Sequence, residues 1–187
     1  MSQQNEHIDA LLKECILGRQ KAQLEIYNRY YRAMYNTALR IVKDSAEAED
    51  VMQEAFLNAF TKLHTFKGEV AFGAWLKRIV INKSIHQYKR QQKSRTVDLE
   101  EVMYKVEDKD GTSLEQHGRT ELKAQKVMET MKRLKDNYRI SLTLHLIEGY
   151  DYQEISDIMD ISYANCRTTI SRAKESLRKM LNITVGT

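Results

Sequence analysis

Apolar residues recur along most of this chain at the spacing of amphipathic helices. The face of the first predicted helix carries Ile8, Leu11, Leu12, Cys15 and Ile16. Gly18 is placed to end this helix. A second helix is predicted over residues 22–42. Its inward face is expected to carry Leu24, Tyr27, Tyr31, Tyr35, Ala38 and Val42.

Two further helices complete the N-terminal half. Asp44 and Glu47 have the spacing of a capping box and predict the start of the third helix. Its apolar positions are Val51, Met52, Ala55, Phe56, Ala59 and Phe60. A short stretch that contains glycine, residues 64–73, separates it from a helix predicted over residues 74–91.

Residues 96–120 differ in character from the rest of the chain. Eight acidic residues and three basic residues lie between Asp98 and Glu121, with glycine and serine among them. So polar a segment cannot bury enough apolar surface to offset the entropy of ordering. We therefore expect a flexible acidic linker here.

The C-terminal half again shows helical patterns. Residues 140–146 alternate in polarity and fit a strand as well as a helix, but a lone strand would have no partner, so we favour helix. Asp151 and Glu154 form a second candidate capping box. A tight turn at residues 160–162 leads to a last helix capped by Ser162. The buried stripe of that helix is expected to be Cys166, Ile170, Ala173, Leu177 and Leu181.

These patterns predict an all-α fold of two small helical domains, residues 1–95 and 121–187, joined by a flexible acidic linker at 96–120. The chain has no proline and only seven glycines, which suits helices better than a β protein. Buried thiols at Cys15 and Cys166 are favoured over a disulfide, consistent with a reducing cytoplasm. We find no signal peptide or membrane-spanning run, so we expect a cytoplasmic protein.

Charge is distributed unevenly, and this suggests partners. From Trp75 to Val97 there are seven basic residues and no acidic one, flanked by aromatic residues at 66, 72, 75 and 88. A helix of one sign of charge suits a polyanion, and aromatic rings can stack on the bases of single-stranded DNA. The alternative is a solvated surface with the aromatic residues in the core, which is the better interpretation for Phe72 and Trp75 individually.

A second candidate is the helix-turn-helix pattern at residues 151–181. Its second helix exposes basic and hydroxyl side chains, which can contact base edges and phosphates in the major groove. The alternative is a plain helical hairpin with a charged surface. A third candidate is the acidic face at residues 47–54, which is either solvated or bound to a basic protein surface.

Catalysis and cofactor binding find no support in the sequence. The five histidines share no metal-ligand spacing with one another or with the cysteines. There is no glycine-rich phosphate loop and no local pattern of a catalytic triad. We therefore expect no metal, no cofactor and no enzymatic activity.

Taken together, these residues resemble the extracytoplasmic-function (ECF) group of bacterial RNA polymerase sigma factors. The segments LEIYNRYY at 24–31, AEAEDVMQEAF at 46–56 and WLKRIVIN at 75–82 resemble the N-terminal promoter-melting domain of the family. The segments YQEISDIM at 152–159 and RAKESL at 172–177 resemble its C-terminal helix-turn-helix domain. The resemblance implies a subunit that binds core RNA polymerase, directs it to promoters and assists melting.

The resemblance also implies a role for individual residues. The acidic helix docks on the β′ clamp in the family, and the matching residues are Asp50, Gln53 and Glu54. The minus-ten element is read by the region that matches Phe66, Lys67, Phe72, Trp75, Lys77, Arg78, Asn82, Lys83, His86, Lys89 and Arg90. Within it, the loop at 67–72 and Asn82 match a pocket for a flipped base. The minus-thirty-five reader matches Arg167, Thr168, Ser171, Arg172 and Lys174.

Further expected partners follow from the resemblance: the β flap of the polymerase, duplex and single-stranded promoter DNA, and an anti-sigma factor, which is often membrane-bound. The linker resembles the segment that threads the nucleic-acid channel of the polymerase. The chain departs from the family in lacking proline after Leu134 and in carrying Asp160 where glycine is usual. It also carries Cys166 where a β-branched residue is usual and a less glycine-rich start of the last helix at 163–165. The alternative function is a conventional helix-turn-helix regulator that binds duplex operators without polymerase.

Overall fold

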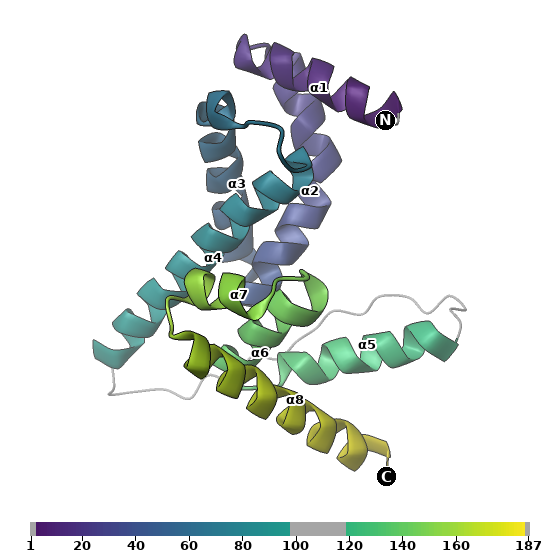
Figure 1. The fold of residues 1–187 in the computed structure, drawn as a ribbon, viewed down its shortest axis with the longest axis vertical. Helices are drawn as coiled ribbons and strands as arrows, with labels where there is room; N and C mark the ends of the chain where they lie inside the picture. The colour runs from purple at the N-terminus through teal and green to yellow at the C-terminus, as the bar shows by residue number, and fades with distance from the viewer. Residues whose placement is uncertain (1–2, 98–118, 186–187) are drawn as a thin grey trace. The chain divides into compact units, whose positions relative to one another are not determined.

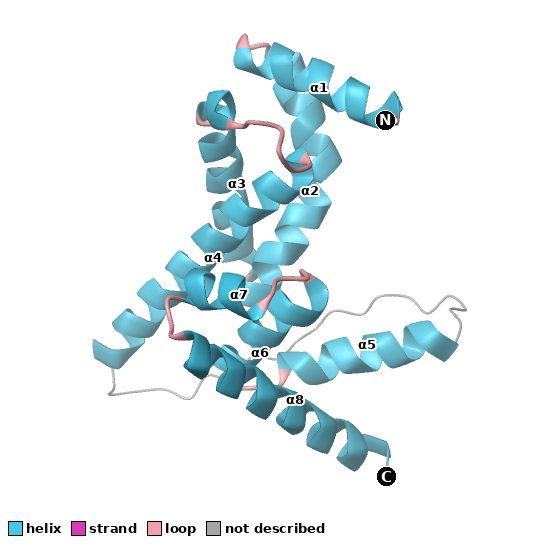
Figure 2. Ribbon diagram, in the orientation of Figure 1, coloured by secondary structure: helices cyan, strands magenta, loops and turns pink. Residues whose placement is uncertain are grey.

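The structure is a computed structural model that describes residues 3–97 and 119–185, and every regular element in these ranges is helical (Figure 1, Figure 2). The all-α prediction is therefore confirmed. The chain divides into two compact units, Met1–Gln91 and Gln92–Thr187. Most of the predicted acidic linker, residues 98–118, lies outside the described residues.

The first unit contains α1 (Gln3–Ile16), α2 (Gln20–Val42), α3 (Ser45–Thr61), a 3₁₀ turn (Leu63–Thr65) and most of α4 (Phe72–Val97), which extends past the boundary at Gln91. Helix α2 packs against α1 and α3, and the 3₁₀ turn contacts α1 and α3. The largest fully buried side chains of the unit are Ile26, Met34, Ile41, Met52, Leu76, Val80 and Ile81. Each such side chain stabilises the fold by roughly 1.5–3 kcal/mol relative to exposure, so this core explains why α2, α3 and α4 stay together.

The inward face of α2 differs from the one predicted. Leu24 is 59% exposed and Tyr27 is half-buried, whereas Ile26 and Met34 are fully buried. The buried stripe instead includes Ala22 and Ile26, which lie one turn apart. Leu24 is two residues, or about 200°, from each of them and therefore lies on the opposite side of the helix. The prediction for Leu24 was therefore wrong. Ile16 is likewise exposed, because it is the last residue of α1 and lies beyond the buried Cys15.

Helix α4 begins at Phe72, two residues earlier than predicted, and approaches α2 closely there. A Cβ atom added at Gly73 would lie 2.9 Å from Cε1 of Tyr30. Tyr30 also packs its ring against Phe72, with centroids 5.4 Å apart. Burial raises the pKa of the Tyr30 hydroxyl, partly offset by Arg29. Gly73 therefore permits a contact between α2 and α4 that a larger residue would have to displace.

Helix α3 carries half of its predicted capping box. The Asp44 carboxylate accepts a hydrogen bond from the Glu47 backbone N at 2.9 Å. The return bond from the Glu47 side chain is not formed, and Glu47 Oε2 is buried without a hydrogen-bond partner among the described residues. The cap thus begins the helix as predicted, while the Glu47 carboxylate turns away from the cap.

The second unit contains α5 (Arg119–Lys132), α6 (Asp136–Leu142), a π-helical turn (Thr143–Ile147), α7 (Tyr152–Met159) and α8 (Tyr163–Val185). Helix α8 packs against α5, α6 and α7. Residues 140–146, which fitted both strand and helix, are helical, as favoured. The core of this unit includes Ile140, Leu142, Leu144, Ile155, Cys166 and Ile170.

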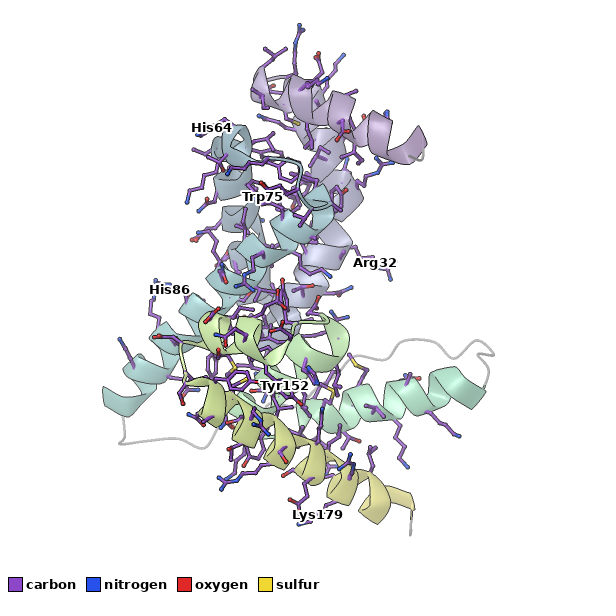
Figure 3. All side chains as sticks on the ribbon, viewed as in Figure 1. Arg32, His64, Trp75, His86, Tyr152 and Lys179 are labelled. Carbon is purple, nitrogen blue, oxygen red and sulfur yellow. The ribbon has the colours of Figure 1, made fainter. Side chains whose placement is uncertain are left out.

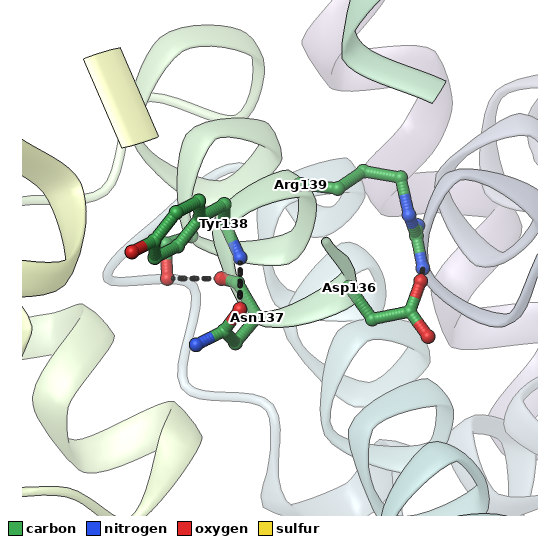
Figure 4. Close-up of polar contacts among 5 residues, drawn as sticks. Asp136, Asn137, Tyr138 and Arg139 are labelled. Atoms are coloured by element: carbon green, nitrogen blue, oxygen red, sulfur yellow. Dashed lines mark hydrogen bonds and ion pairs between the residues drawn. The ribbon is translucent and has the colours of Figure 1, made fainter. Parts of the chain in front are cut away.

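Helix α6 starts where the ECF family often has proline. Lys135 precedes it with φ −54° and ψ 142° and makes no side-chain cap. The first turn is held instead by an ion pair between Arg139 Nη2 and Asp136 Oδ1 at 3.2 Å (Figure 4). The hydroxyl of Ser141 donates to the Asn137 carbonyl at 2.7 Å. The missing proline is therefore compatible with a regular α6.

The turn between α7 and α8 forms as the sequence predicts. Asp151 and Glu154 make both bonds of a capping box, at 2.8 and 2.9 Å. Asp160 ends α7 in the left-handed conformation, with φ 56° and ψ 54°. Ser162 accepts a hydrogen bond from the Asn165 backbone N at 3.2 Å and caps α8. Local hydrogen bonds thus define the turn and the starts of the two helices of a helix-turn-helix unit.

Candidate protein and nucleic-acid interfaces

The acidic candidate face lies on the side of α3 that points away from the core. Asp50, Gln53 and Glu54 are all exposed and fall one turn apart on the same side of the helix. Gln53 Nε2 donates to Glu49 Oε1 at 3.1 Å, which holds the amide along the helix surface. The three residues therefore form a continuous surface that a partner could contact.

This face meets the basic helix at one point. Lys83 Nζ on α4 lies 3.1 Å from Glu54 Oε2 on α3, and the two side chains are 29% and 69% exposed. A cavity of about 480 Å³ surrounds the pair, lined by Glu47, Asp50, Val51, Glu54, Asn82, Lys83, His86, Gln87 and Arg90. The acidic surface of α3 and the basic surface of α4 are therefore linked by an ion pair.

The aromatic residues near the start of α4 form one cluster. Phe66 lies 5.3 Å from Trp75 and 5.7 Å from Phe72, measured between ring centroids. Phe72 is only 4% exposed, so its ring is a packing residue and cannot itself stack on a base. Phe66 and Trp75 are half-buried and therefore remain partly exposed to solvent. Phe72 is thus the buried member of this cluster, and Phe66 and Trp75 are its partly exposed members.

The polar residues predicted to contact the minus-ten element are spread along α4. Asn82, Lys83, His86 and Arg90 line the cavity beside α3. The side chains of Lys77, Arg78 and Lys89 are half-buried, and Lys67 is exposed in the preceding loop. Figure 3 shows His86 further along α4 than Trp75.

The two parts of the predicted base pocket are not brought together. Asn82 follows Phe72 by ten residues on one helix, which corresponds to about 15 Å along its axis. Asn82 instead lines the cavity with residues of α3. In this structure, then, the loop at 67–72 lies with the aromatic cluster, and Asn82 lies with the cavity.

The recognition helix α8 presents most of its predicted contacts to solvent. Arg167, Thr168, Ser171 and Arg172 are exposed. Thr168 Oγ1 donates to the Ala164 carbonyl at 2.9 Å. Lys174 is half-buried, and its Nζ lies 5.9 Å from the centre of the Tyr152 ring at the start of α7. Lys174 therefore also helps hold α7 against α8 through a cation–π contact.

Two residues of these surfaces escaped the sequence analysis. Tyr152 contacts Lys174 and also lies 5.0 Å from His145, measured between ring centroids. Leu57 is 68% exposed on the same side of α3 as Asp50 and Gln53. The spacing of Leu57, seven residues after Asp50, is the sequence signal that places it on this side of the helix.

No metal centre or reactive thiol emerges. Within residues 3–97 and 119–185, no three His, Cys, Asp or Glu side chains are placed to hold a metal ion. Burial raises the pKa of both Cys15 and Cys166, which keeps the thiols protonated and unreactive. None of the helices in those ranges combines the length and the apolar character that crossing a membrane requires.

Comparison with known proteins identifies the family. The model of sigma-70 region 2 matches residues 26–94, and that of sigma-70 region 4 matches residues 124–177. The chain is 31% identical over 166 residues to the ECF RNA polymerase sigma-E factor of Escherichia coli K12, covering 86% of each chain. The chain belongs to the ECF sigma factors. It is also 31% identical over 159 residues to the RNA polymerase sigma-H factor of Pseudomonas aeruginosa, covering 82% of each.

Solved structures agree on the fold of this ECF sigma factor. CnrH in complex with the cytosolic domain of CnrY matches with a TM-score of 0.54 and 22% identity, over 93% of this chain and 96% of the other. RpoE of Bartonella quintana, solved with the anti-sigma factor NepR, matches with a TM-score of 0.59 and 19% identity, over 85% and 96%. Family membership confirms the predicted sigma-factor function and does not favour the alternative of a conventional regulator.

Proposed function

We propose that this sigma factor docks on core RNA polymerase through the exposed face of α3 formed by Asp50, Gln53 and Glu54. These side chains are exposed and acidic or amide-bearing, so they suit a basic protein surface. A DNA partner is excluded for this face by charge repulsion. The resemblance names the matching partner as the β′ clamp.

The minus-ten contacts are proposed for α4 and the aromatic cluster. Phe66 and Trp75 offer partly accessible rings, and the basic side chains of α4 suit phosphates. Base stacking on one such ring contributes about 1–3 kcal/mol, which is of the order needed to hold a base extracted from the duplex. Melting is then favoured by capture of the single strand rather than by any covalent step.

The minus-thirty-five contacts are proposed for α8. Arg167 and Thr168 lie in the second turn of this helix, the part that enters the major groove in helix-turn-helix proteins. The Arg167 guanidinium can make two hydrogen bonds to the edge of a guanine. Ser171 and Arg172 lie one turn further from the start of α8. Promoter choice is therefore expected to depend on Arg167 more than on the other α8 residues.

The proposal rests on three surfaces that occur together in one chain, two within the part matched by region 2 and one within the part matched by region 4. An acidic α3 and a basic α4 lie within the part matched by region 2, and a capped helix-turn-helix lies within the part matched by region 4. A conventional regulator needs only the last of these.

Several further properties belong to the same proposal. We place the promoter-melting domain at residues 1–95, the linker at 96–120 and the helix-turn-helix domain at 121–187. The protein is proposed to act in the cytoplasm, without catalysis, and to be held inactive by an anti-sigma factor. The anti-sigma proposal draws on structural relatives that were solved as complexes with such proteins.

The test is promoter binding with and without core enzyme. Start sites are first mapped by transcription with purified core polymerase, and the same promoter duplexes are then used in gel shifts. We expect stable complexes with core and only weak, salt-sensitive binding without it. Tight sequence-specific binding by the sigma factor alone would favour a conventional regulator, and metal-dependent cleavage of the DNA would favour an enzyme.

The docking face is tested separately. Gln53→Ala combined with Glu54→Ala should weaken binding to core polymerase in a competition assay and leave the far-UV circular dichroism unchanged, because both side chains are exposed. Asp9→Ala removes an exposed carboxylate from α1 and should bind core normally. Full competition by the double variant would contradict the proposed docking face.

A further inference from the structure

Leu57 is an apolar side chain on the solvent side of a well-packed helix. It is 68% exposed. The buried residues of α3 are Ala48, Val51, Met52, Ala55, Phe56 and Ala59. At about 100° per residue, Leu57 falls roughly opposite the mean direction of these six. The side chain thus stands at the point of α3 that is farthest from the core, where it contributes little to folding.

The neighbours of Leu57 on this surface are the proposed docking residues. Asp50, Gln53, Glu54 and Leu57 occupy positions i, i+3, i+4 and i+7, so they share one side of the helix. On a helical projection, Leu57 lies between Asp50 and Gln53, and Glu54 lies about 60° to one side. Leu57 therefore continues the same face of the helix, about 4.5 Å beyond Glu54 along the axis.

Protein interfaces usually combine an apolar contact that becomes buried with polar and charged residues beside it. The buried centre provides most of the affinity, while charged rim residues mainly speed association and set the salt dependence. A single exposed leucine needs no explanation by itself. Leu17 and Leu24 are comparably exposed at 69% and 59%, but neither lies on the acidic face of α3.

We infer that Leu57 is the apolar anchor of the docking face, and that the surface of core RNA polymerase it meets combines basic side chains with an apolar pocket. This inference rests on the proposed function of α3. The charge of Asp50 and Glu54 suits the basic part of the partner, and the uncovered Leu57 suits the apolar part.

The inference assigns different roles to the residues of one surface. Asp50 and Glu54 steer association, so their contribution should shrink as salt rises. Leu57 excludes water after docking, so its contribution should persist at high salt and appear mainly in the dissociation rate. This difference separates the anchor from the rim experimentally.

The experiment measures binding of the full-length chain to purified core RNA polymerase, in low and high salt, for a set of matched variants. Leu57→Ala should weaken binding by about tenfold to thirtyfold at both salt concentrations, since it removes three carbon atoms from the contact. Leu57→Met should retain most of the affinity, because it preserves apolar surface. Leu17→Ala removes an equally exposed leucine and should bind normally.

The variants distinguish failure of the Leu57 inference from failure of the docking proposal on which it rests. If Glu54→Gln weakens binding at low salt and Leu57→Ala does not, the docking face stands and the anchor is wrong. If neither substitution has an effect, the proposed docking face itself fails. Unchanged circular dichroism and thermal unfolding show that Leu57→Ala is folded, as expected for so exposed a side chain.

Discussion

The ion pair between Glu54 and Lys83 joins the proposed polymerase-docking face to the proposed DNA-binding helix, so one substitution should affect the two partners in opposite directions. Lys83 Nζ lies 3.1 Å from Glu54 Oε2 and partly neutralises the acidic face. Lys83→Gln removes that neutralising charge and one phosphate contact together. We therefore expect the variant to bind core polymerase more tightly and single-stranded promoter DNA more weakly.

The magnitude follows from the exposure of the pair. Glu54 is 69% exposed and Lys83 is 29% exposed, so water and salt screen their attraction. Exposed ion pairs contribute about 0.2–1 kcal/mol. Core binding should therefore improve by at most about fivefold at low salt and return to the unaltered value near 1 M salt. For single-stranded DNA, the slope of log affinity against log salt should fall by about 0.7.

The assay is equilibrium binding of labelled sigma factor to core polymerase, with a parallel titration of single-stranded promoter DNA against the holoenzyme. Lys93→Gln is the matched control, because it removes the same charge from an exposed position on α4 that does not line the cavity. It should weaken DNA binding and leave core binding unchanged. If Lys83→Gln weakens core binding or behaves as Lys93→Gln does, Glu54 is not neutralised by Lys83 in solution and the reasoning fails.

Further predictions concern the helix-turn-helix and α4. Arg167→Ala should change which promoters are selected in start-site mapping. Lys89→Ala should lower the affinity for DNA equally at all promoters and reduce the slope of log affinity against log salt by about 1, the effect of losing one phosphate contact. Asp151→Ala removes the carboxylate that accepts the hydrogen bond from the Glu154 backbone N, one of the two bonds of the capping box, and should lower the stability of the second unit by about 1–2 kcal/mol in urea. The circular dichroism transition should shift, but the fluorescence of Trp75, the single tryptophan, should not, since it reports the first unit. Asp160→Val should cost about 1–2 kcal/mol because φ is 56° there, while Asp160→Gly should be tolerated.

The helices and the helix-turn-helix were predictable from the sequence because their signals are local. The Asp151 and Glu154 capping box, the left-handed Asp160 and the Ser162 cap each involve residues within a few positions of one another. Such hydrogen bonds form without reference to the rest of the fold. The buried stripe from Cys166 to Leu177 followed from helical periodicity in the same way.

The composition of the candidate surfaces was also present in the sequence. The absence of acidic residues from α4 and the exposed acidic positions of α3 can be counted directly. The resemblance of these segments to the ECF sigma factors was specific enough to predict the sigma-factor function. The matches to sigma-70 regions 2 and 4 confirm that function. The roles of the individual residues remain predictions.

Tertiary packing decided the rest. Leu24 and Met34 are both apolar residues of α2, yet the neighbouring helices cover Met34 and leave Leu24 in solvent. Core packing was predicted for both Phe72 and Trp75, which lie three residues apart, but Phe72, which also contacts Tyr30, is buried and Trp75 is only half-buried. Glu54 and Lys83 are 29 positions apart in the sequence and meet because α3 and α4 are adjacent. Periodicity shows that a helix has an apolar side, but which residues are covered depends on how distant segments pack.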